Sequence, residues 1–133
     1  IKRGSQVRDR RETAMETDDD DYDDDDKALI IALATGDVVI ELLPEVAPLH
    51  VERIETLAES GQYDNVAFHR VLDGFVAQTG DVQFGDLEDG YDPARVGTGG
   101  SALDDLPLEP SEISFERGVV GMARSSDPDS ANS

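Results

Sequence analysis

The sequence contains no cysteine and no tryptophan among its 133 residues. Without cysteine, the chain has no disulfide, no thiolate nucleophile and no cysteine-based zinc site. Its apolar runs are shorter than the roughly 18 residues that a transmembrane helix needs, and no apolar leader follows the basic first residues. We therefore expect one domain at most, with no membrane partner, in a reducing compartment that we take to be the cytoplasm.

Basic side chains are scarce as well. Eleven lysines and arginines stand against 31 aspartates and glutamates, which gives a net charge of −20. A general nucleic-acid binder needs clustered lysine and arginine, so this composition disfavours that class. The two histidines, His50 and His69, do not form the H-E-x-x-H spacing of a zinc hydrolase. The sequence therefore predicts neither a nucleic-acid site nor a metal site.

Charge divides the chain into three parts. Residues 1–14 carry a net charge of +3 and residues 15–27 a net charge of −8, whereas residues 28–133 carry 20 acidic side chains, five arginines and no lysine. The first two parts have no apolar period, so they cannot bury enough surface to offset the conformational entropy lost on ordering. We predict a charged, disordered tail over residues 1–27 and a folded domain over residues 28–133.

The acidic run in the tail has several interpretations. The simplest is a solvated segment, and the alternative is a site for metal ions or a basic partner. The sequence Asp23-Asp24-Asp25-Asp26-Lys27 also matches an enteropeptidase cleavage site, which is typical of an engineered tag or linker. A natural start at Met15 would instead make residues 1–14 upstream sequence.

Two β-hairpins are predicted in the folded part. Apolar runs at residues 28–34 and 38–43 flank a Thr-Gly-Asp turn signal. A second pair, residues 66–72 and 75–78, flanks Asp73-Gly74, a strong short-range hairpin signal. Together they indicate an antiparallel, mainly β domain.

One helix is predicted between the hairpins. Pro48 suits the first turn of a helix, and Gly61 is the expected C-terminal cap. His50 is expected at the surface of the first turn. The apolar face of this helix is formed by residues at spacings of three and four: Val51, Ile54, Leu57 and Ala58.

The C-terminal third reads mostly as loop. Residues 81–114 are rich in glycine and proline, and a loop of this length is usually functional or disordered. Its Gly97-Thr98-Gly99-Gly100 stretch does not match the phosphate-binding G-x-x-x-x-G-K-[ST] pattern, and the folded part has no lysine to reach a phosphate. A last strand is predicted over residues 118–123.

Arg70 is the most suggestive single residue. Strand alternation places it on one face with Phe68 and Leu72. One interpretation is a structural ion pair with one of the domain's many acidic side chains. The other is a fixed cation beside an apolar pocket, where it could donate to the carbonyl of a bound amide. The pattern alone leaves both open.

The segment from Tyr63 to Asp81, YDNVAFHRVLDGFVAQTGD, resembles the signature of the cyclophilin-type peptidyl-prolyl cis–trans isomerases. Three other stretches agree with that family and come in its order: the hairpin strand Gly36–Leu42 with the Ala47-Pro48 helix start, Gly97–Gly100, and Phe115–Arg124. The resemblance runs from about Ala28 to Ser133 and is closest to small bacterial members.

This resemblance implies a closed antiparallel β-barrel capped by helices, and an enzyme that rotates X–Pro peptide bonds and assists protein folding. Arg70 matches the catalytic arginine, and Gln78 matches the glutamine that binds the substrate backbone and orients the arginine. Phe75 matches the aromatic floor of the proline pocket. Val76 stands where most members have methionine.

The remaining implied site residues border the neighbouring groove. Gly97 lies at its edge, and Ala123 and Arg124 match the strand that pairs with the bound peptide. The implied partners are proline-containing peptides, unfolded proteins and cyclosporin-type ligands. The resemblance implies a monomer that needs no metal and no cofactor.

The family continues beyond the position of Ser133 into strands that close the barrel. We therefore expect this chain to be a fragment, incomplete at the C-terminus and impaired in stability or activity. The alternative function is a module that binds proline-containing segments without turning them over.

Overall fold

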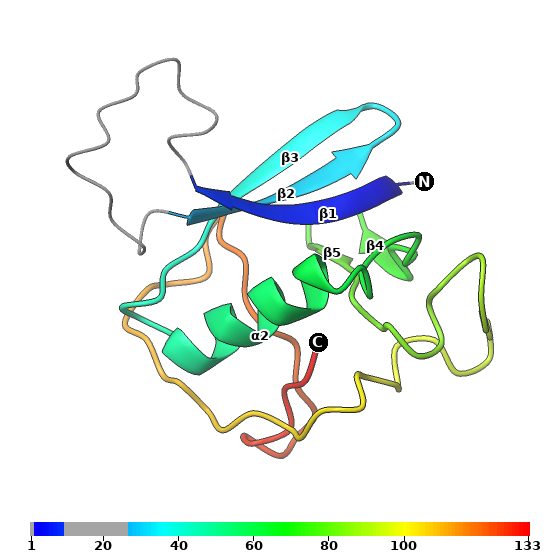
Figure 1. Cartoon of the computed structure of the whole chain (residues 1–133). Coiled ribbons are helices and arrows are strands. Elements are labelled where there is room, and N and C mark those ends of the chain that lie inside the picture. Colours follow the sequence, from blue (N-terminus) through cyan, green and yellow to red (C-terminus); the bar gives the residue numbers. More distant parts are fainter. Residues whose placement is uncertain (1, 10–26) are drawn as a thin grey trace.

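The computed structural model describes residues 2–9 and 27–133 (Figure 1). Within these residues, three strands form one antiparallel sheet in the order β1-β2-β3, and two more form a separate hairpin. The elements, in chain order, are β1 (Lys2–Asp9), β2 (Lys27–Leu33), β3 (Gly36–Glu41), α2 (Pro48–Glu59), β4 (Arg70–Leu72) and β5 (Val76–Gln78).

Strands β2 and β3 form the first predicted hairpin, which is confirmed. Leu33 pairs with Gly36 across the turn, and the register runs on to Ala28 opposite Glu41. Strand β2 carries an almost unbroken apolar run, and its residues 28–31 are buried. Strand β3 is largely exposed on both faces, and its Ile40 is half-buried against the core.

Strand β1 corrects one prediction. Residues 2–9 pair antiparallel with β2, from Lys2 opposite Leu33 to Asp9 opposite Lys27. The prediction of disorder over residues 1–27 is therefore wrong for residues 2–9 and for Lys27, which begins β2, while Ile1 and residues 10–26 lie outside the described residues. Composition missed this strand because an edge of a sheet offers unpaired backbone N–H and C=O groups to any extended segment, whatever its side chains.

Helix α2 begins and ends where the sequence predicts. Pro48 occupies the first turn, and Gly61 follows the C-terminus with a φ of +77°. The Gly61 N–H donates to Ala58 O at 3.2 Å and the Gln62 N–H to Leu57 O at 3.0 Å. This is the Schellman arrangement, which favours glycine because it needs a left-handed residue.

The N-terminus of α2 corrects a second prediction. His50 is buried, with 9% of its surface exposed, and not at the surface. Its Nε2 lies 2.8 Å from Pro107 O, and a carbonyl only accepts, so Nε2 carries the hydrogen. The carboxylate of Glu109 accepts the backbone N–H groups of Leu49 and His50 at 3.1 and 2.8 Å. A segment some 60 residues away in sequence therefore covers this end of the helix.

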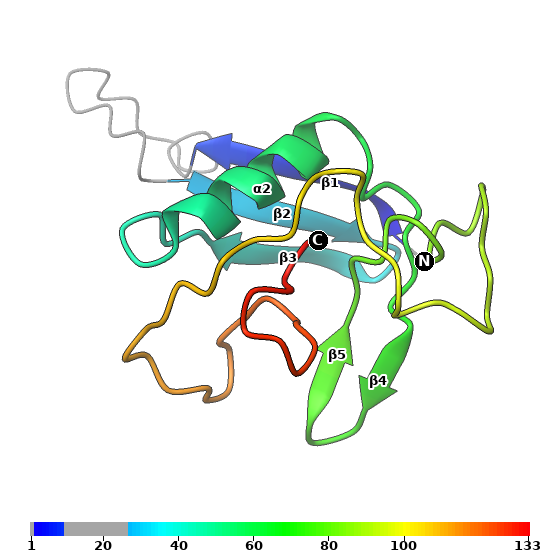
Figure 2. The same cartoon turned by 90° about the horizontal axis from the view of Figure 1, so that it is seen from below.

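The core lies between α2 and one face of the sheet (Figures 1 and 2). The predicted apolar face of the helix is confirmed, because Val51, Leu57 and Ala58 are buried and Ile54 packs against them. Leu57 is fully buried. The buried cluster joins residues of the sheet, the helix and the segments after each: Leu29, Ile31, Leu42, Val51, Leu57, Ala58 and Tyr63.

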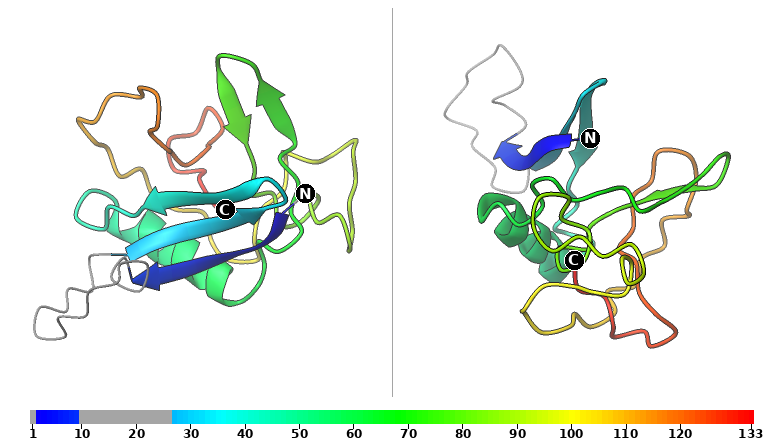
Figure 3. Two further views of the ribbon diagram at one scale, coloured as in Figure 1. Left: turned by 90° about the horizontal axis from the view of Figure 1, so that it is seen from above. Right: turned by 90° about the vertical axis from the view of Figure 1, so that its right-hand side faces the viewer.

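Strands β4 and β5 form the second predicted hairpin, which projects from the body of the molecule away from the sheet (Figures 2 and 3). Its strands are shorter than predicted. Residues 66–69 lie outside β4, and Val66 forms only an isolated bridge with Asp86. Phe75 belongs to the turn, where its N–H donates to Leu72 O at 3.0 Å.

The rest of the chain, residues 79–133, is loop and turn within the described structure. The strand predicted over residues 118–123 is not formed, and Val119 and Val120 are exposed. A strand needs a neighbour for its backbone groups, and no described strand runs beside this segment. The described residues accordingly form two small antiparallel sheets and not the closed barrel implied by the resemblance. None of the described helices is long and apolar enough to cross a bilayer.

Candidate active site

The hairpin β4–β5 places three of the predicted site residues on one face. Arg70 pairs with Gln78, and Leu72 pairs with Val76. Directly opposed residues share a face of an antiparallel pair, and Arg70 and Leu72 share a face because they are two apart. Arg70, Val76 and Gln78 therefore point to the same side of the hairpin.

Phe75 lies in the turn at the end of this hairpin. It has 72% of its surface exposed, and its ring centroid is 5.7 Å from the guanidinium carbon of Arg70. This is within the range of a cation–π contact. The arrangement joins a cation, an amide side chain and an aromatic ring within the nine residues from Arg70 to Gln78.

Arg70 is exposed, and no described acidic side chain lies within ion-pair distance of it. The structural ion pair therefore finds no partner in the described part of the chain. The guanidinium of Arg70 makes no hydrogen bond or ion pair within the described residues, and its described contact is with the Phe75 ring, so its donors are available to a bound molecule.

The other predicted site residues meet Gln78 around a cavity of about 410 Å³ at the base of the hairpin. Gly97, Ala123 and Arg124 line it together with Gln78, whereas Arg70, Phe75 and Val76 lie on the hairpin outside the lining. Arg124 donates from Nη1 to Ser125 O at 2.9 Å. Ala123 and Arg124 thus reach the site without forming a strand.

Asp81 organises one wall of this cavity. Its side chain is buried, and its two oxygens accept four backbone N–H groups. Oδ1 accepts from Gln83 at 3.0 Å and Phe84 at 2.9 Å, and Oδ2 accepts from Gly97 at 2.7 Å and Gly99 at 3.0 Å. Burial raises the pKa of Asp81, but the four donors together outweigh it and hold this pKa below its ordinary value.

The last residues of the chain line the same cavity as Asp81. Ser133 donates to Gly80 O at 2.7 Å, and Asn132 Oδ1 accepts from both the backbone N–H and the hydroxyl of Ser101 at 2.7 Å. Arg53 on helix α2 donates from Nη1 to Asn132 O at 3.0 Å. Hydrogen bonds therefore connect these last residues both to helix α2 and to the loop that contains Gly80 and Ser101.

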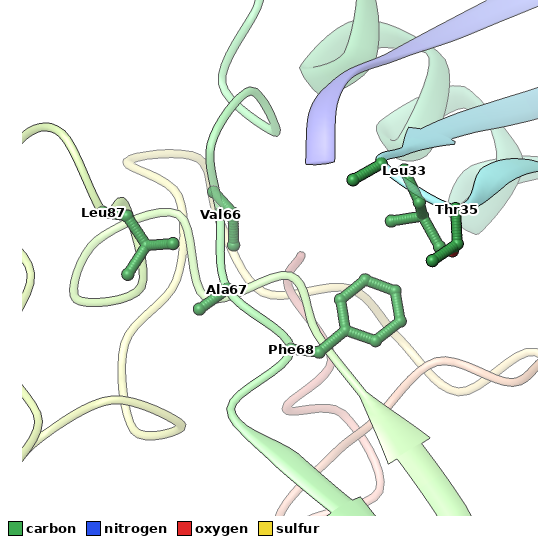
Figure 4. Close-up of a pocket in the computed structure, with 7 residues that line it drawn as sticks. Leu33, Thr35, Val66, Ala67, Phe68 and Leu87 are labelled. Carbon is green, nitrogen blue, oxygen red and sulfur yellow. The ribbon is translucent and has the colours of Figure 1, made fainter. Parts of the chain in front are cut away.

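A second cavity, of about 380 Å³, contains none of the predicted site residues (Figure 4). It lies between the β2–β3 turn, with Leu33 and Thr35, and the segment that leads into β4, with Val66 and Phe68. Its lining is mostly apolar and offers few groups that would orient a polar ligand. The hairpin cavity is the better candidate for chemistry.

Sequence reasoning missed Asp81 and Asn132. Two of the Asp81 hydrogen bonds, and those of Asn132 to Ser101, reach residues between 16 and 31 positions away, so no local pattern shows these contacts. One signal was present in the glycines of the 97–100 stretch, because a glycine-rich loop permits close approach of backbone groups.

No group of three or more histidine, aspartate or glutamate side chains in the described residues is placed to hold a metal ion. What the site offers is a guanidinium, a carboxamide, an aromatic ring and a set of backbone groups. Groups of these kinds can donate to and orient an amide without forming covalent bonds.

Comparison with known proteins gives the same family as the motifs. The family described as cyclophilin type peptidyl-prolyl cis-trans isomerase/CLD matches residues 28–133. A protein of Brucella suis biovar 1, named "Probable peptidyl-prolyl cis-trans isomerase", is 58% identical over 105 residues, which are 79% of this chain and 54% of that protein. The corresponding protein of Brucella abortus (strain 2308) is 57% identical over the same length.

A more distant relative is peptidyl-prolyl cis-trans isomerase 9 of Schizosaccharomyces pombe, 42% identical over 77 residues, which are 58% of this chain and 11% of that protein. No solved structure shows a significant match. The chain spans about half the length of the Brucella relatives. By the match over residues 28–133, the chain belongs to the cyclophilin-type peptidyl-prolyl cis–trans isomerase family.

Proposed function

We propose that this chain catalyses cis–trans rotation about X–Pro peptide bonds in proline-containing peptides and unfolded proteins. The observation that carries the proposal is the arrangement on the hairpin, where Arg70 is paired with Gln78 and lies over Phe75. These three residue types suit the three parts of an X–Pro unit, namely its carbonyl, its backbone and its ring.

The reaction needs only a site that prefers the rotated amide. Amide resonance sets a barrier of about 18–20 kcal/mol, so uncatalysed X–Pro rotation takes on the order of tens to hundreds of seconds. Rotation decouples the nitrogen lone pair from the carbonyl. An enzyme accelerates the reaction by binding this twisted state better than either planar state.

Arg70 is the residue proposed to make that distinction. Its guanidinium donates to the carbonyl oxygen and to the pyramidal nitrogen of the rotated bond. Because no described carboxylate is within ion-pair distance of Arg70, its donors need not break an ion pair to reach the substrate. No bond is formed or broken and no proton is transferred in this step.

Phe75 and Val76 are proposed to hold the proline ring while Gln78 binds the peptide backbone. Phe75 offers most of its ring to solvent, so a proline ring would bury apolar surface against it. Gln78 lies both on the hairpin and in the cavity lining. It therefore connects the rotating bond to the groove lined by Gly97, Ala123 and Arg124.

The alternative is a module that binds proline-containing segments without turnover. The exposure of Phe75 favours it, because a pocket that encloses its ring would hold the rotated state more tightly than an open hairpin does. Val76 also gives a short apolar wall. We propose a monomer for either function, and cyclosporin-type compounds as ligands of the same surface.

Exchange NMR of an Ala-Pro peptide with catalytic amounts of the protein separates these functions. Isomerase activity predicts cis–trans exchange at least roughly tenfold faster than the uncatalysed rate. A binding module predicts peptide-induced shifts of the β4–β5 amide signals with unchanged exchange. Unchanged exchange and unchanged amide signals together would contradict both functions.

A further inference from the structure

We propose that Asp81 is a positioning residue, which holds the segment Gly97–Gly99 against Gln78 and thereby sets how tightly the site binds its peptide. This inference rests on the proposed function, because it concerns the groove beside the rotating bond. Asp81 itself need not touch the bond.

The first observation is the completeness of the carboxylate's contacts. Asp81 has 4% of its surface exposed, and each of its oxygens accepts two backbone N–H groups. Two of these donors are in the turn that follows Asp81, and two are in the segment 97–99. One side chain thus connects the turn that follows it to Gly97 and Gly99, which lie 16 and 18 residues after Asp81.

The second observation is the place of Asp81 in the chain. It follows Gln78 by three residues, and the intervening residues are themselves held. Thr79 donates to Ala67 O at 2.8 Å, and Gly80 O accepts from Ser133 at 2.7 Å. Gln78, Asp81 and Gly97 all line the same cavity. The position of Gly97 relative to Gln78 is therefore fixed through Asp81.

The third observation is the closeness of the packing. A Cβ atom added to Gly99 would lie 2.7 Å from Asp81 Oδ1 and 2.7 Å from Phe84 Cδ2, closer than real contacts allow. The backbone at position 99 lies so close to the carboxylate that only glycine, which has no Cβ, fits there. The glycines of this stretch bind the protein's own carboxylate and not a phosphate.

Only a carboxylate satisfies this set of donors. Asparagine has one accepting oxygen, and its NH₂ group would face two backbone N–H groups. We expect the one accepting oxygen of the asparagine to stay on the adjacent turn, whose donors are two and three residues away, so Asp81→Asn should release the glycine segment. Because the released segment forms the groove and not the rotating centre, substrate affinity should fall while turnover of bound substrate is retained.

The test compares Asp81→Asn with two matched variants in a proline-peptide isomerisation assay. Asp92→Asn serves as the loop control, since Asp92 also accepts two hydrogen bonds, from Ala94 N and Arg95 Nε, but is absent from the cavity lining. Leu57→Ala serves as the stability control, because it opens the core away from the cavity. Gly99→Ala is a second probe, which displaces the segment from its own side.

We expect Asp81→Asn and Gly99→Ala to raise KM by roughly tenfold, the effect of one charge-assisted hydrogen bond, with kcat within about twofold of wild type. The two control variants should leave the KM of the folded protein unchanged. An unchanged KM in Asp81→Asn and Gly99→Ala, or an equal rise in Leu57→Ala, would overturn the positioning role.

Amide hydrogen exchange at Gly97 and Gly99 tests the positioning role of Asp81 without an activity assay. We expect faster exchange at these two amides in Asp81→Asn but not in Asp92→Asn. A wild type without turnover or peptide binding would contradict the proposed function, while unchanged exchange at both glycines would contradict the positioning role. The two failures are thus distinguishable.

Discussion

The body of the molecule, which contains helix α2 and the cavity wall at Asp81, differs from the β4–β5 hairpin in how many contacts its side chains make. In the body, Leu57 is fully buried and Asp81 accepts four backbone hydrogen bonds. On the hairpin, Phe75 and Val71 have 72% and 63% of their surfaces exposed, and Arg70 contacts only the Phe75 ring among the interactions described for its side chain.

This difference assigns the two regions to different processes. Buried side chains with many contacts, such as Leu57, stabilise the folded chain. Exposed side chains with accessible donors or apolar surface, such as Arg70 and Phe75, are the ones that could bind a substrate. Gln78 stands between the two regions, because it belongs to the hairpin and also lines the cavity that Asp81 organises. Variants in the two regions should therefore change different measured quantities, and we rank them by the unfolding free energy they remove.

Leu57→Ala should have the largest effect on stability. Leu57 is fully buried between helix α2 and the sheet, and removing a buried leucine side chain costs about 2–5 kcal/mol. Urea unfolding followed by circular dichroism measures this loss. A cost below about 1 kcal/mol would show that the core between the helix and the sheet is not formed, and the contrast between the two regions would fail.

Asp81→Asn should lower the free energy of unfolding by about 1–3 kcal/mol at neutral pH, because buried N–H groups lose their acceptor. The folded-state pKa of Asp81 lies below its ordinary value of 3.8, since four backbone donors outweigh the effect of burial. The ionised carboxylate therefore contributes stability above a pH of about 4, and this contribution is lost as the pH falls through the folded pKa.

Urea unfolding of wild type and Asp81→Asn between pH 7 and acidic pH measures whether the stability contributed by the Asp81 carboxylate falls as the pH falls. The difference in unfolding free energy should be constant at neutral pH and shrink below a pH of about 4. Asp92→Asn is the matched control: the hydrogen bond from Arg95 lowers the pKa of Asp92 as well, but this carboxyl is more exposed than that of Asp81, so its pH-dependent difference should be the smaller one. A difference that grows on acidification would contradict the assigned hydrogen bonds.

The sequence predicted the elements whose signals are local. Asp73-Gly74 specifies a turn through its own backbone preferences, and Pro48 with Gly61 marks the two ends of a helix by capping chemistry. Both were confirmed. The face of the helix was confirmed for the same reason, since an apolar period of three and four residues places those side chains together on any helix.

The predictions that failed depend on distant partners. His50 was expected at the surface, but Pro107 and Glu109 cover it. Residues 118–123 have the apolar composition of a strand and no described strand beside them, so they remain a loop. The hydrogen bonds of Asp81 to Gly97 and Gly99 could not be foreseen, because loop folding decides which distant backbone groups meet a carboxylate.

Glu109→Ala should lower the free energy of unfolding by about 0.5–2 kcal/mol, which is the range for loss of a helix N-terminal cap. Its carboxylate accepts the N–H groups of Leu49 and His50, which have no partners within the helix. Glu112→Ala is the matched control on the same loop, with an exposed side chain. An equal cost in both variants would contradict the capping role of Glu109.

Phe75→Ala should have the smallest effect on stability, within about 0.5 kcal/mol, because the ring is mostly exposed. Its effect on peptide affinity should be larger, since a proline ring loses the apolar surface against which it packs. Thermal unfolding and peptide titration of the same sample measure the two quantities. A large loss of stability with unchanged affinity would reverse the roles assigned to the two regions.

The most direct test of the central claim is exchange NMR on an Ala-Pro peptide with Arg70→Ala, compared with wild type and Arg95→Ala. Arg95 is the matched control because it also lies over a ring, that of Phe84 at 4.5 Å, but on the loop. We predict that Arg70→Ala lowers the catalysed exchange rate by at least about tenfold, which corresponds to about 1.4 kcal/mol of transition-state stabilisation, while its circular dichroism spectrum stays that of wild type and Arg95→Ala retains activity. Equal exchange rates for Arg70→Ala and wild type would contradict the claim that this hairpin arginine carries the reaction.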